Sequence, residues 1–221
     1  MRFLSVFPLG VKNLQQWIII PIKGLSSGKT RLSNFLTDLQ RVELNSQLLS
    51  RTLGVIKGVE GNLNHCLVVS NQNDACDLAD EMGAKTICES NPCGLNSALN
   101  IARSYVLTQN ARDLLILACD LPWLHEKALL LLKAIIKINR KPLLIEDKFH
   151  MGTNGMWIPT DINLPFLFGG DSLKRHTLAW HSMEVFSRRW YDESLSMDLD
   201  NQNDFTLLST GYGHWLKDIT G

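Results

Sequence analysis

The sequence predicts a single α/β domain in which helices cover both faces of a mainly parallel, Rossmann-like sheet. Short segments that are apolar throughout alternate along the chain with longer segments of helical periodicity. Strands that are apolar on both faces are typical of parallel sheets, and their alternation with helices indicates crossover connections. The length of 221 residues suits one domain with a sizeable core. We therefore expect one domain over residues 1–221, with its core at about 17–208 and one active site.

The predicted elements follow from the apolar pattern. Strands are expected at residues 17–22, 66–69, 85–88, 114–119, 143–145 and 185–190. Helices are expected at residues 32–56, 74–82, 95–107, 126–138 and 173–180, with Asp74 as the N-cap of the second. Between Glu146 and Leu173 the residues Gly, Asn, Asp and Pro break the pattern, so we expect irregular, site-forming structure there. A last helix after Asn203 is expected only to cover the sheet.

The composition argues against a general affinity for polyanions. Lys+Arg and Asp+Glu both number 22, so the formal charge is zero and no overall field attracts nucleic acid or anionic lipid. The five cysteines lack a CxxC pair, which is typical of reduced thiols. The first residues show no signal-peptide cleavage site, and the longest apolar run, residues 128–136, is too short to span a bilayer. We expect a soluble, cytoplasmic protein that binds neither nucleic acid nor a membrane.

The first candidate site is the basic loop KGLSSGKTR at residues 23–31, between a strand and a helix. Its backbone N–H groups and the cations of Lys23, Lys29 and Arg31 suit phosphate groups. The GKT at residues 28–30 matches the end of a Walker A motif, yet Lys23 stands where that motif requires its first glycine. A solvated basic turn is the alternative interpretation of this loop.

Three aspartates are the candidates for a metal site. Asp120 follows an apolar strand, at the edge where ligands of open α/β sheets bind. Asp198 and Asp200 alternate on an extended segment, which sends both carboxylates to one side. Carboxylates suit Mg²⁺ held against the phosphates of a nucleotide. The alternatives are capping roles, for Asp120 in the following turn and for Asp200 or Asn203 at the last helix.

Two Gly-rich segments lie in the irregular region, GTNG at residues 152–155 and FGGDS at residues 168–172. Hydroxyls and free amides at the start of a helix suit a phosphate or a carboxylate. Ordinary turn chemistry, with Asp171 or Ser172 as an N-cap, is the alternative. The six histidines show no metal-ligand spacing, so we assign none of them a catalytic role.

Together with a few more short motifs, these sites form an ordered set over residues 17–208. The set is Pro21-Ile22-Lys23, Lys29-Thr30-Arg31-Leu32, Val68-Val69-Ser70, Gly94-Leu95-Asn96-Ser97-Ala98-Leu99, Asp120-Leu121-Pro122, Gly152-Thr153-Asn154, Phe168-Gly169 to Ser172, Arg175-His176 and Asp198-Leu199-Asp200. It resembles the 2-phospho-L-lactate and phosphoenolpyruvate guanylyltransferases of coenzyme F420 biosynthesis. The resemblance implies a glycosyltransferase-A-like nucleotidyltransferase fold, to which the molybdenum cofactor guanylyltransferases also belong. Those relatives carry an LxGGxSxRMG-type loop, and this chain has KGLSSGKTR instead.

The resemblance also implies a role for each motif. Catalysis would involve Lys23, Lys29 and Arg31 on the triphosphate of GTP, together with Asp120. Mg²⁺ would be held by Asp120, Asp198 and Asp200. The guanosine would contact Ser70, Gly94, Leu95 and Asn96, and the phospho-acid would contact Thr153, Gly169 and Ser172. Cys93 would border the acceptor, as a selectivity contact or as a filler thiol.

The implied reaction transfers GMP from GTP to the phosphate of 2-phospholactate, phosphoenolpyruvate or 3-phosphoglycerate and releases pyrophosphate. The acceptor phosphate is ionised near neutral pH and needs no general base, so catalysis would rest on positioning and electrostatics. A P-loop kinase or GTPase and a non-catalytic nucleotide sensor are the alternative functions. The expected partners are GTP and a small phosphorylated hydroxy acid, with a homodimer as one option.

Overall fold

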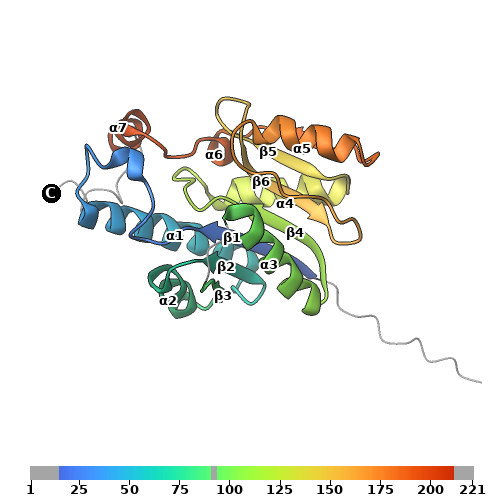
Figure 1. Cartoon of the computed structure of the whole chain (residues 1–221), viewed down its shortest axis with the longest axis horizontal. Coiled ribbons are helices and arrows are strands. Elements are labelled where there is room, and N and C mark those ends of the chain that lie inside the picture. The colour runs from blue at the N-terminus through green and yellow to red at the C-terminus, as the bar shows by residue number, and fades with distance from the viewer. Residues whose placement is uncertain (1–14, 91–93, 212–221) are drawn as a thin grey trace, which may run out of the picture.

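The computed structural model of the chain describes residues 15–90 and 94–211. Within these residues seven strands form one sheet, with helices between them along the chain (Figure 1). The strands are β1 (Gln15–Ile22), β2 (Cys66–Ser70), β3 (Lys85–Cys88), β4 (Ala111–Leu117), β5 (Leu143–Glu146), β6 (Thr153–Pro159) and β7 (Arg188–Trp190). The helices are α1 (Asp38–Glu60), α2 (Asn73–Met82), α3 (Leu95–Thr108), α4 (Glu126–Ile138), α5 (Ser172–His181), α6 (Glu193–Ser196) and α7 (Gln202–Gly211), with a 3-10 turn, η1 (Thr30–Leu32), ahead of α1. No helix in the described ranges is both long and apolar enough to cross a membrane.

The sheet has the strand order β3-β2-β1-β4-β6-β5-β7 and is mainly parallel, as the sequence predicts. β1 pairs in parallel with β2 and with β4, so that Ile18 lies opposite both Cys66 and Leu115. β6 runs antiparallel to its neighbours β4 and β5, and β7 pairs in parallel with β5. The carboxyl ends of β1, β2, β3 and β4 therefore meet at one edge of the sheet, which is where ligands of such folds bind.

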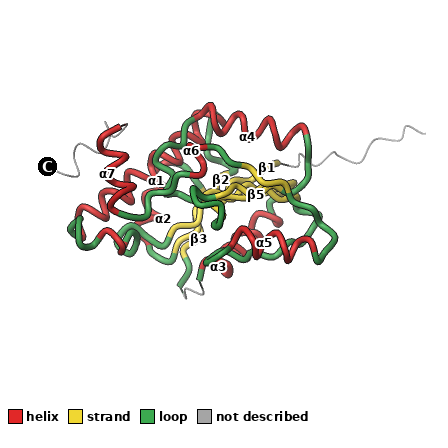
Figure 2. The backbone as a smooth tube through the Cα atoms, turned by 90° about the horizontal axis from the view of Figure 1, so that it is seen from above, coloured by secondary structure: helices red, strands yellow, loops and turns green. Residues whose placement is uncertain are grey.

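Helices cover both faces of the sheet, which confirms the predicted layering (Figure 2). Along β1, Ile18 and Ile20 belong to the core shared with α1, α2 and α4, whereas Trp17 and Ile19 belong to the core shared with α3 and α5. This division follows from the strand geometry, because successive side chains point to opposite faces. A strand that is apolar at every position is therefore required in the middle of this sheet.

The first long helix begins later than the sequence predicts. The apolar pattern suggests a start near residue 32, whereas α1 begins at Asp38. Thr37 caps the helix, because its hydroxyl oxygen accepts a bond from the Gln40 N–H at 3.2 Å and the Gln40 side chain accepts from the Thr37 N–H at 2.9 Å. Leu32 and Leu36 mimic helical periodicity because both are buried, but they fill a separate small core beside α7.

The prediction of irregular structure after Glu146 is wrong for β6. In the sequence, Gly155 and Pro159 resemble turn residues, which hides the strand. In the structure a Cβ at position 155 would lie 2.6 Å from the backbone oxygen of Ile116 in β4. Gly155 therefore permits a close approach of two strands that no other residue would allow.

The last helix does not cover the sheet, contrary to the prediction. Phe205 and Leu208 of α7 pack with Leu44 and Leu48 of α1 in a core of their own. Figure 1 shows α7 beside the start of α1, away from the strands. The helix thus holds the segment before it, residues 198–200, against the loop that precedes α1. The strand predicted at 185–190 is also shorter than expected and spans Arg188–Trp190.

Candidate active site

A cavity of about 610 Å³ opens at the carboxyl edge of the parallel strands. Its walls come from the ends of β1, β2 and β4, the start of β6, the basic loop and the start of α3. Eight residues that the sequence assigned to the site line it: Lys23, Lys29, Arg31, Gly94, Leu95, Asp120, Thr153 and Asp200. This volume lies within the range of small-molecule sites.

The basic loop is fixed by α1 and α2. The prediction that Asp74 is the N-cap of α2 is wrong, because Gln72 occupies that position. The Asp74 carboxylate instead accepts bonds from the N–H groups of Leu25 and Ser26, both at 3.2 Å. On the other side Asn45 donates to the Leu25 carbonyl at 2.7 Å. Two of the loop amides that could meet phosphates are thus bound to Asp74, and the loop offers the cavity mainly its cations.

Lys29 joins the basic loop to the acidic residues. Its backbone is left-handed, with φ at 57°, a conformation that costs energy for a residue with a Cβ. The ammonium lies 2.5 Å from Asp120 Oδ2 and 3.6 Å from Asp200 Oδ1. Burial opposes the charge of Lys29, but these carboxylates outweigh burial and raise its pKa above the ordinary value. Lys29 is therefore a cation held between two candidate metal ligands.

Backbone contacts place the two acidic segments side by side. The Leu199 N–H donates to the Asp120 carbonyl at 3.1 Å. From α1, the Thr52 hydroxyl donates to the Cys119 carbonyl at 3.2 Å, and Arg51 Nε donates to the Pro122 carbonyl at 2.9 Å. The loop after β4 is thus attached to a long helix. Asp120 is held by main-chain geometry as well as by its own side chain.

Asp198 is the most perturbed carboxylate of the site. Burial, followed by the like charges of Asp200 and Asp120, raises the pKa of Asp198 to about 6. Among the described residues its Oδ1 atom accepts no hydrogen bond, and this atom lies 3.4 Å from the ammonium of Lys148. Asp198 does not line the cavity directly, unlike Asp200. The negative charge of this carboxylate is only partly compensated by Lys148, so Asp198 is suited to bind an additional cation.

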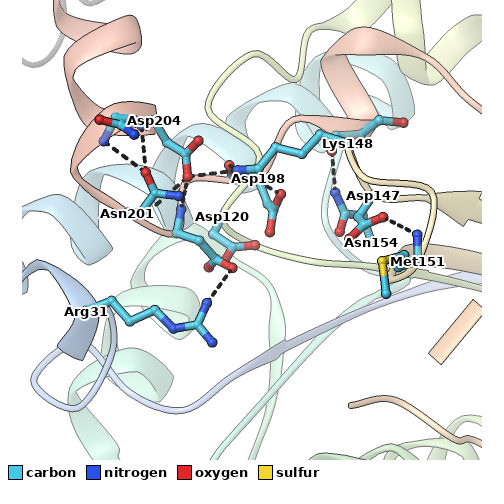
Figure 3. A network of polar contacts seen from close by, with 12 residues as sticks. Arg31, Asp120, Asp147, Lys148, Met151, Asn154, Asp198, Asn201 and Asp204 are labelled. Carbon is cyan, nitrogen blue, oxygen red and sulfur yellow. Dashed lines mark hydrogen bonds and ion pairs between the residues drawn. The ribbon is translucent and has the colours of Figure 1, made fainter. Parts of the chain in front are cut away.

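Lys148 contacts the acidic segment on the side away from Arg31. Figure 3 shows its side chain extending toward Asp198 and Asp204. Its ammonium donates to the Asp198 carbonyl at 2.8 Å and lies 2.8 Å from Asp204 Oδ2. The same Asp204 oxygen accepts from the N–H groups of Asp200 and Asn201, at 2.9 and 3.0 Å. These contacts shape the turn. No motif in the sequence indicates Lys148 or Asp204, and Lys148 in particular pairs with residues far along the chain.

Within the described ranges the side chains, as they stand, do not form a set of three or more His, Cys, Asp or Glu ligands around one metal position. The donor types nevertheless fit a hard divalent cation, because carboxylate oxygens are its preferred ligands. Asp198 Oδ1 is buried without a hydrogen bond, and Lys29 supplies positive charge between Asp120 and Asp200. The three aspartates are therefore the residues that could hold a metal here.

At the other end of the cavity, Thr153 is held by two side chains of α5. Its hydroxyl oxygen accepts from Ser172 Oγ at 3.1 Å and lies 3.3 Å from His176 Nδ1. The His176 ring is fully buried, and burial lowers its pKa to about 4. Its Nε2 accepts from the Leu167 N–H at 2.8 Å, so in the neutral ring the proton is on Nδ1. The Nδ1 proton faces both Thr153 and the backbone of Ser172, so α5 orients the Thr153 hydroxyl.

Five of the residues assigned to the site from the sequence do not line the cavity: Ser70, Asn96, Asp198, Gly169 and Ser172. Ser70 Oγ accepts from the Gln72 N–H at 3.2 Å. The Asn96 amide is bound to Phe168, accepting from its N–H at 2.8 Å and donating to its carbonyl at 3.1 Å. Asn96 therefore holds the FGGDS segment near α3. Cys93 lies outside the described residues, and the proposed ligand contacts of all these residues stay predictions.

Residues 16–217 match the model of a protein family described as guanylyl transferase CofC like. The chain belongs to this family. The match of the CofC-like model covers every element of the described sheet. It also confirms the resemblance drawn from the ordered motifs.

Relatives in the CofC-like family are named for different acceptors. The chain is 28% identical to the phosphoenolpyruvate guanylyltransferase of Thermobaculum terrenum, over 91% of this chain and 86% of the relative. It is 26% identical to the 3-phospho-D-glycerate guanylyltransferase of Colwellia psychrerythraea, over 87% and 90%. It is 29% identical to the 2-phospho-L-lactate guanylyltransferase of Methanocaldococcus infernus, over 84% and 81%.

Solved structures share the fold of the CofC-like chain. A Desulfovibrio desulfuricans protein assigned to the nucleotide-diphospho-sugar transferases superposes with a TM-score of 0.71 at 13% identity, covering 92% of this chain and 91% of that one. The CMP:2-keto-3-deoxy-manno-octonic acid synthetase solved with CTP superposes with a TM-score of 0.60 at 11% identity, covering 89% and 97%. At these identities the likeness establishes the fold, which is the one that the sequence predicts.

Proposed function

We propose that the protein is a guanylyltransferase that transfers GMP from GTP to the phosphate of a small phospho-hydroxy acid. Phosphoenolpyruvate, 3-phosphoglycerate and 2-phospholactate are the candidate acceptors, and coenzyme F420 biosynthesis is the proposed pathway. Membership of the CofC-like family and the names of the relatives support this function. The observation that carries it is one cavity lined by Lys29, Arg31, Asp120, Asp200 and Thr153.

The cationic side of the cavity suits the triphosphate of GTP. Arg31 pairs with Asp200 at 3.4 Å, but three quarters of its side chain is exposed, so its guanidinium can reach a phosphate. Lys23 lines the same wall. Positive charge at this place would offset the charge that builds on the leaving pyrophosphate. We assign Lys23, Lys29 and Arg31 to this role.

Asp120, Asp198 and Asp200 would hold Mg²⁺. When bound, the ion would neutralise phosphate charge and polarise the α-phosphate. Asp120 and Asp200 face the cavity, while Asp198 stands behind them with its charge only partly offset by Lys148. The Lys29 ammonium keeps Asp120 and Asp200 together and lies close enough to the phosphate path to bind an oxygen there.

The Thr153 end of the cavity suits the acceptor. The Thr153 hydroxyl accepts from Ser172 Oγ and lies in the cavity, where it can donate to the carboxylate or phosphate of the acid. Ser172 does not line the cavity but positions the Thr153 hydroxyl through the bond from its Oγ atom. An acceptor phosphate oxygen then forms a bond to the α-phosphorus while the bond to the bridging oxygen of pyrophosphate breaks. The acceptor oxygen is already ionised, so no side chain has to remove a proton.

A P-loop kinase or GTPase is less well supported. In those proteins the Walker A motif opens a helix, whereas residues 28–30 lead into η1 and α1 begins only at Asp38. In addition, Lys29 makes its closest contact with Asp120. The family match favours nucleotidyl transfer over this alternative.

We also propose that the protein works in the cytoplasm, without nucleic-acid or membrane partners, and that it forms a homodimer. The cysteines described in the structure are free thiols: Cys66, Cys76, Cys88 and Cys119. Free thiols suit a reducing compartment. Size-exclusion chromatography with light scattering tests the dimer, and a monomer at micromolar concentration would overturn it.

Pyrophosphate release tests the function. The purified protein is incubated with Mg²⁺ and GTP, with each of the three acids added in turn and with ATP replacing GTP as a control. We expect release that depends on GTP and on one of the acids. Binding of GTP without release in the presence of any acid would instead identify a nucleotide sensor.

A further inference from the structure

Two buried oxygen atoms on the cavity wall have no hydrogen-bond partner in the described part of the chain. They are Glu89 Oε1 and Asn71 Oδ1. Both residues line the cavity. Unpaired acceptors that are shielded from water are costly in a folded protein, so each calls for an explanation. A ligand that donates hydrogen bonds at this wall would supply one.

The backbone holds both residues at the end of the sheet. Asn71 follows β2 and Glu89 follows β3, and these strands pair in parallel with Ser70 opposite Cys88. The pairing extends one step further, because the Glu89 N–H donates to the Ser70 carbonyl at 2.7 Å. The two side chains therefore start from neighbouring, fixed positions. Asn71 and Glu89 together form the wall of the cavity at this end.

The distance between this wall and the acidic residues matches the length of a nucleoside triphosphate. Three strand spacings separate β3 from β4, which amounts to about 14 Å, and this is comparable with an extended nucleoside triphosphate. Between the two ends the cavity is lined by apolar side chains that can pack against a flat base: Val69, Leu95, Ala98 and Ile116. If phosphates lie at Lys29 and Asp120, the base reaches Glu89.

The chemistry of the wall selects among bases. An ionised carboxylate only accepts hydrogen bonds. Guanine presents neighbouring donors on one edge, the N1–H and the two hydrogens of the N2 amine. Adenine, cytosine and uracil each place an acceptor beside their donor on that edge, which would face the carboxylate unfavourably.

We propose that Glu89 is the residue that specifies guanine, by accepting from N1–H and from one N2 hydrogen, and that Asn71 Oδ1 accepts the other N2 hydrogen. This inference rests on the proposed use of a nucleoside triphosphate and names the group that selects it. It assigns recognition of the base to side chains at the ends of β2 and β3. Gly94 and Leu95, which line the cavity, would then contact the rest of the nucleoside.

The test compares GTP, ITP and ATP with the wild-type protein, Glu89→Gln and Asn71→Ala. ITP lacks only the N2 amine. We expect Glu89→Gln to lower kcat/KM for GTP about ten- to a hundredfold, the range typical of a lost bidentate base contact, and to narrow the preference for GTP over ATP. Asn71→Ala should weaken use of GTP and leave ITP unchanged. The control is Glu81→Gln, an exposed residue on α2, which should behave as wild type.

Nucleotide binding without acceptor separates this inference from the proposed function. Affinities for GDP, IDP and ADP are measured by calorimetry, and thermal unfolding verifies that each variant is folded. Wild-type preference for GDP that falls in Glu89→Gln supports the inference even if no acid yields pyrophosphate. An unchanged preference for GDP over ADP in folded Glu89→Gln would overturn it, whether or not the protein is an active transferase.

Discussion

The backbone N–H of Leu199 donates to the carbonyl of Asp120 at 3.1 Å, which joins two acidic segments that are far apart in the sequence. Because of this bond, the segment that carries Asp198 and Asp200 lies beside Asp120, and the Lys29 ammonium contacts the carboxylates of both Asp120 and Asp200. Preformed geometry of this kind lowers the cost of assembling a site around a charged substrate. The first prediction therefore concerns Asp120.

Replacing Asp120 by Ala should abolish turnover. The change removes a proposed metal ligand and leaves the buried Lys29 ammonium without its nearest partner. We expect kcat to fall by about a thousandfold or more, as when other centres of transition-state charge stabilisation are removed. Initial rates of pyrophosphate release at saturating substrates measure the effect, with Asp161→Ala at an exposed position as the control. Near-normal turnover in a folded Asp120→Ala protein would refute the metal assignment.

Replacing Lys148 by Met should destabilise the protein. The side chain is 9% exposed and serves both Asp198 and Asp204. Without it, two largely buried carboxylates lose their common cation, which costs about 3 kcal/mol in the free energy of unfolding. Urea unfolding measures this loss, and Lys174→Met on the exposed face of α5 is the matched control. Equal stabilities of the two variants would contradict the structural role of Lys148.

Stability should depend on pH through His176. Its folded-state pKa of about 4 lies below the unfolded value of about 6.5, so the neutral ring stabilises the folded protein. That contribution is complete above pH 6.5 and is lost as the pH falls toward 4, by a total of about 3 kcal/mol. The measurement is urea unfolding at pH 7.5, 5.5 and 4.5, comparing wild type with His176→Gln. The variant should show a flatter dependence over this window, and parallel curves would argue against a buried neutral imidazole.

Two glycines should respond in opposite ways to substitution by Ala. At Gly155 the added Cβ meets the Ile116 backbone oxygen at 2.6 Å, so we expect destabilisation of about 1–3 kcal/mol. At Gly54, inside α1, a Cβ meets nothing within 4 Å. Alanine there should stabilise the helix by about 0.5–1 kcal/mol. Thermal unfolding of both variants would show whether β4 and β6 approach as closely as described.

The sequence predicts an element of this fold well when a local residue pattern determines it. It predicts an element poorly when contacts between residues far apart in the chain determine it. The strand Lys85–Cys88 and the helix Glu126–Ile138 have their predicted bounds, because Gly83 marks the end of the helix before the strand and the apolar residues of the helix repeat at helical spacing. β6 was missed, since Gly155 serves a contact with Ile116 that no local pattern encodes. The start of α1 was misplaced, since burial of Leu32 in a second core imitates helical periodicity.

The candidate site shows the same division. Asp120 was found because it follows a strand, and its neighbourhood in space was inferred from the family's ordered motifs. Lys148 was not found, because its partners Asp198 and Asp204 come from a segment about fifty residues later in the sequence. Asn96 was assigned to the nucleotide, whereas its amide is bound to the backbone of Phe168. A motif thus identifies a residue without identifying its hydrogen-bond partners.

The position of β4 between β1 and the antiparallel β6 divides the cavity by chain segment. Asn71 and Glu89, proposed to contact the base, come before β4 in the chain, and Thr153, proposed to contact the acid, comes from β6, with Asp120 at the boundary. This arrangement offers a simple explanation of how relatives named for three different acceptors could have diverged in their acceptor. Substitutions in the later part of the gene can change the acceptor while the nucleotide wall is inherited unchanged. In chimaeras that exchange this later part between relatives, we expect GTP to remain the nucleotide substrate. The acceptor acid should be that of the relative from which the later part is taken.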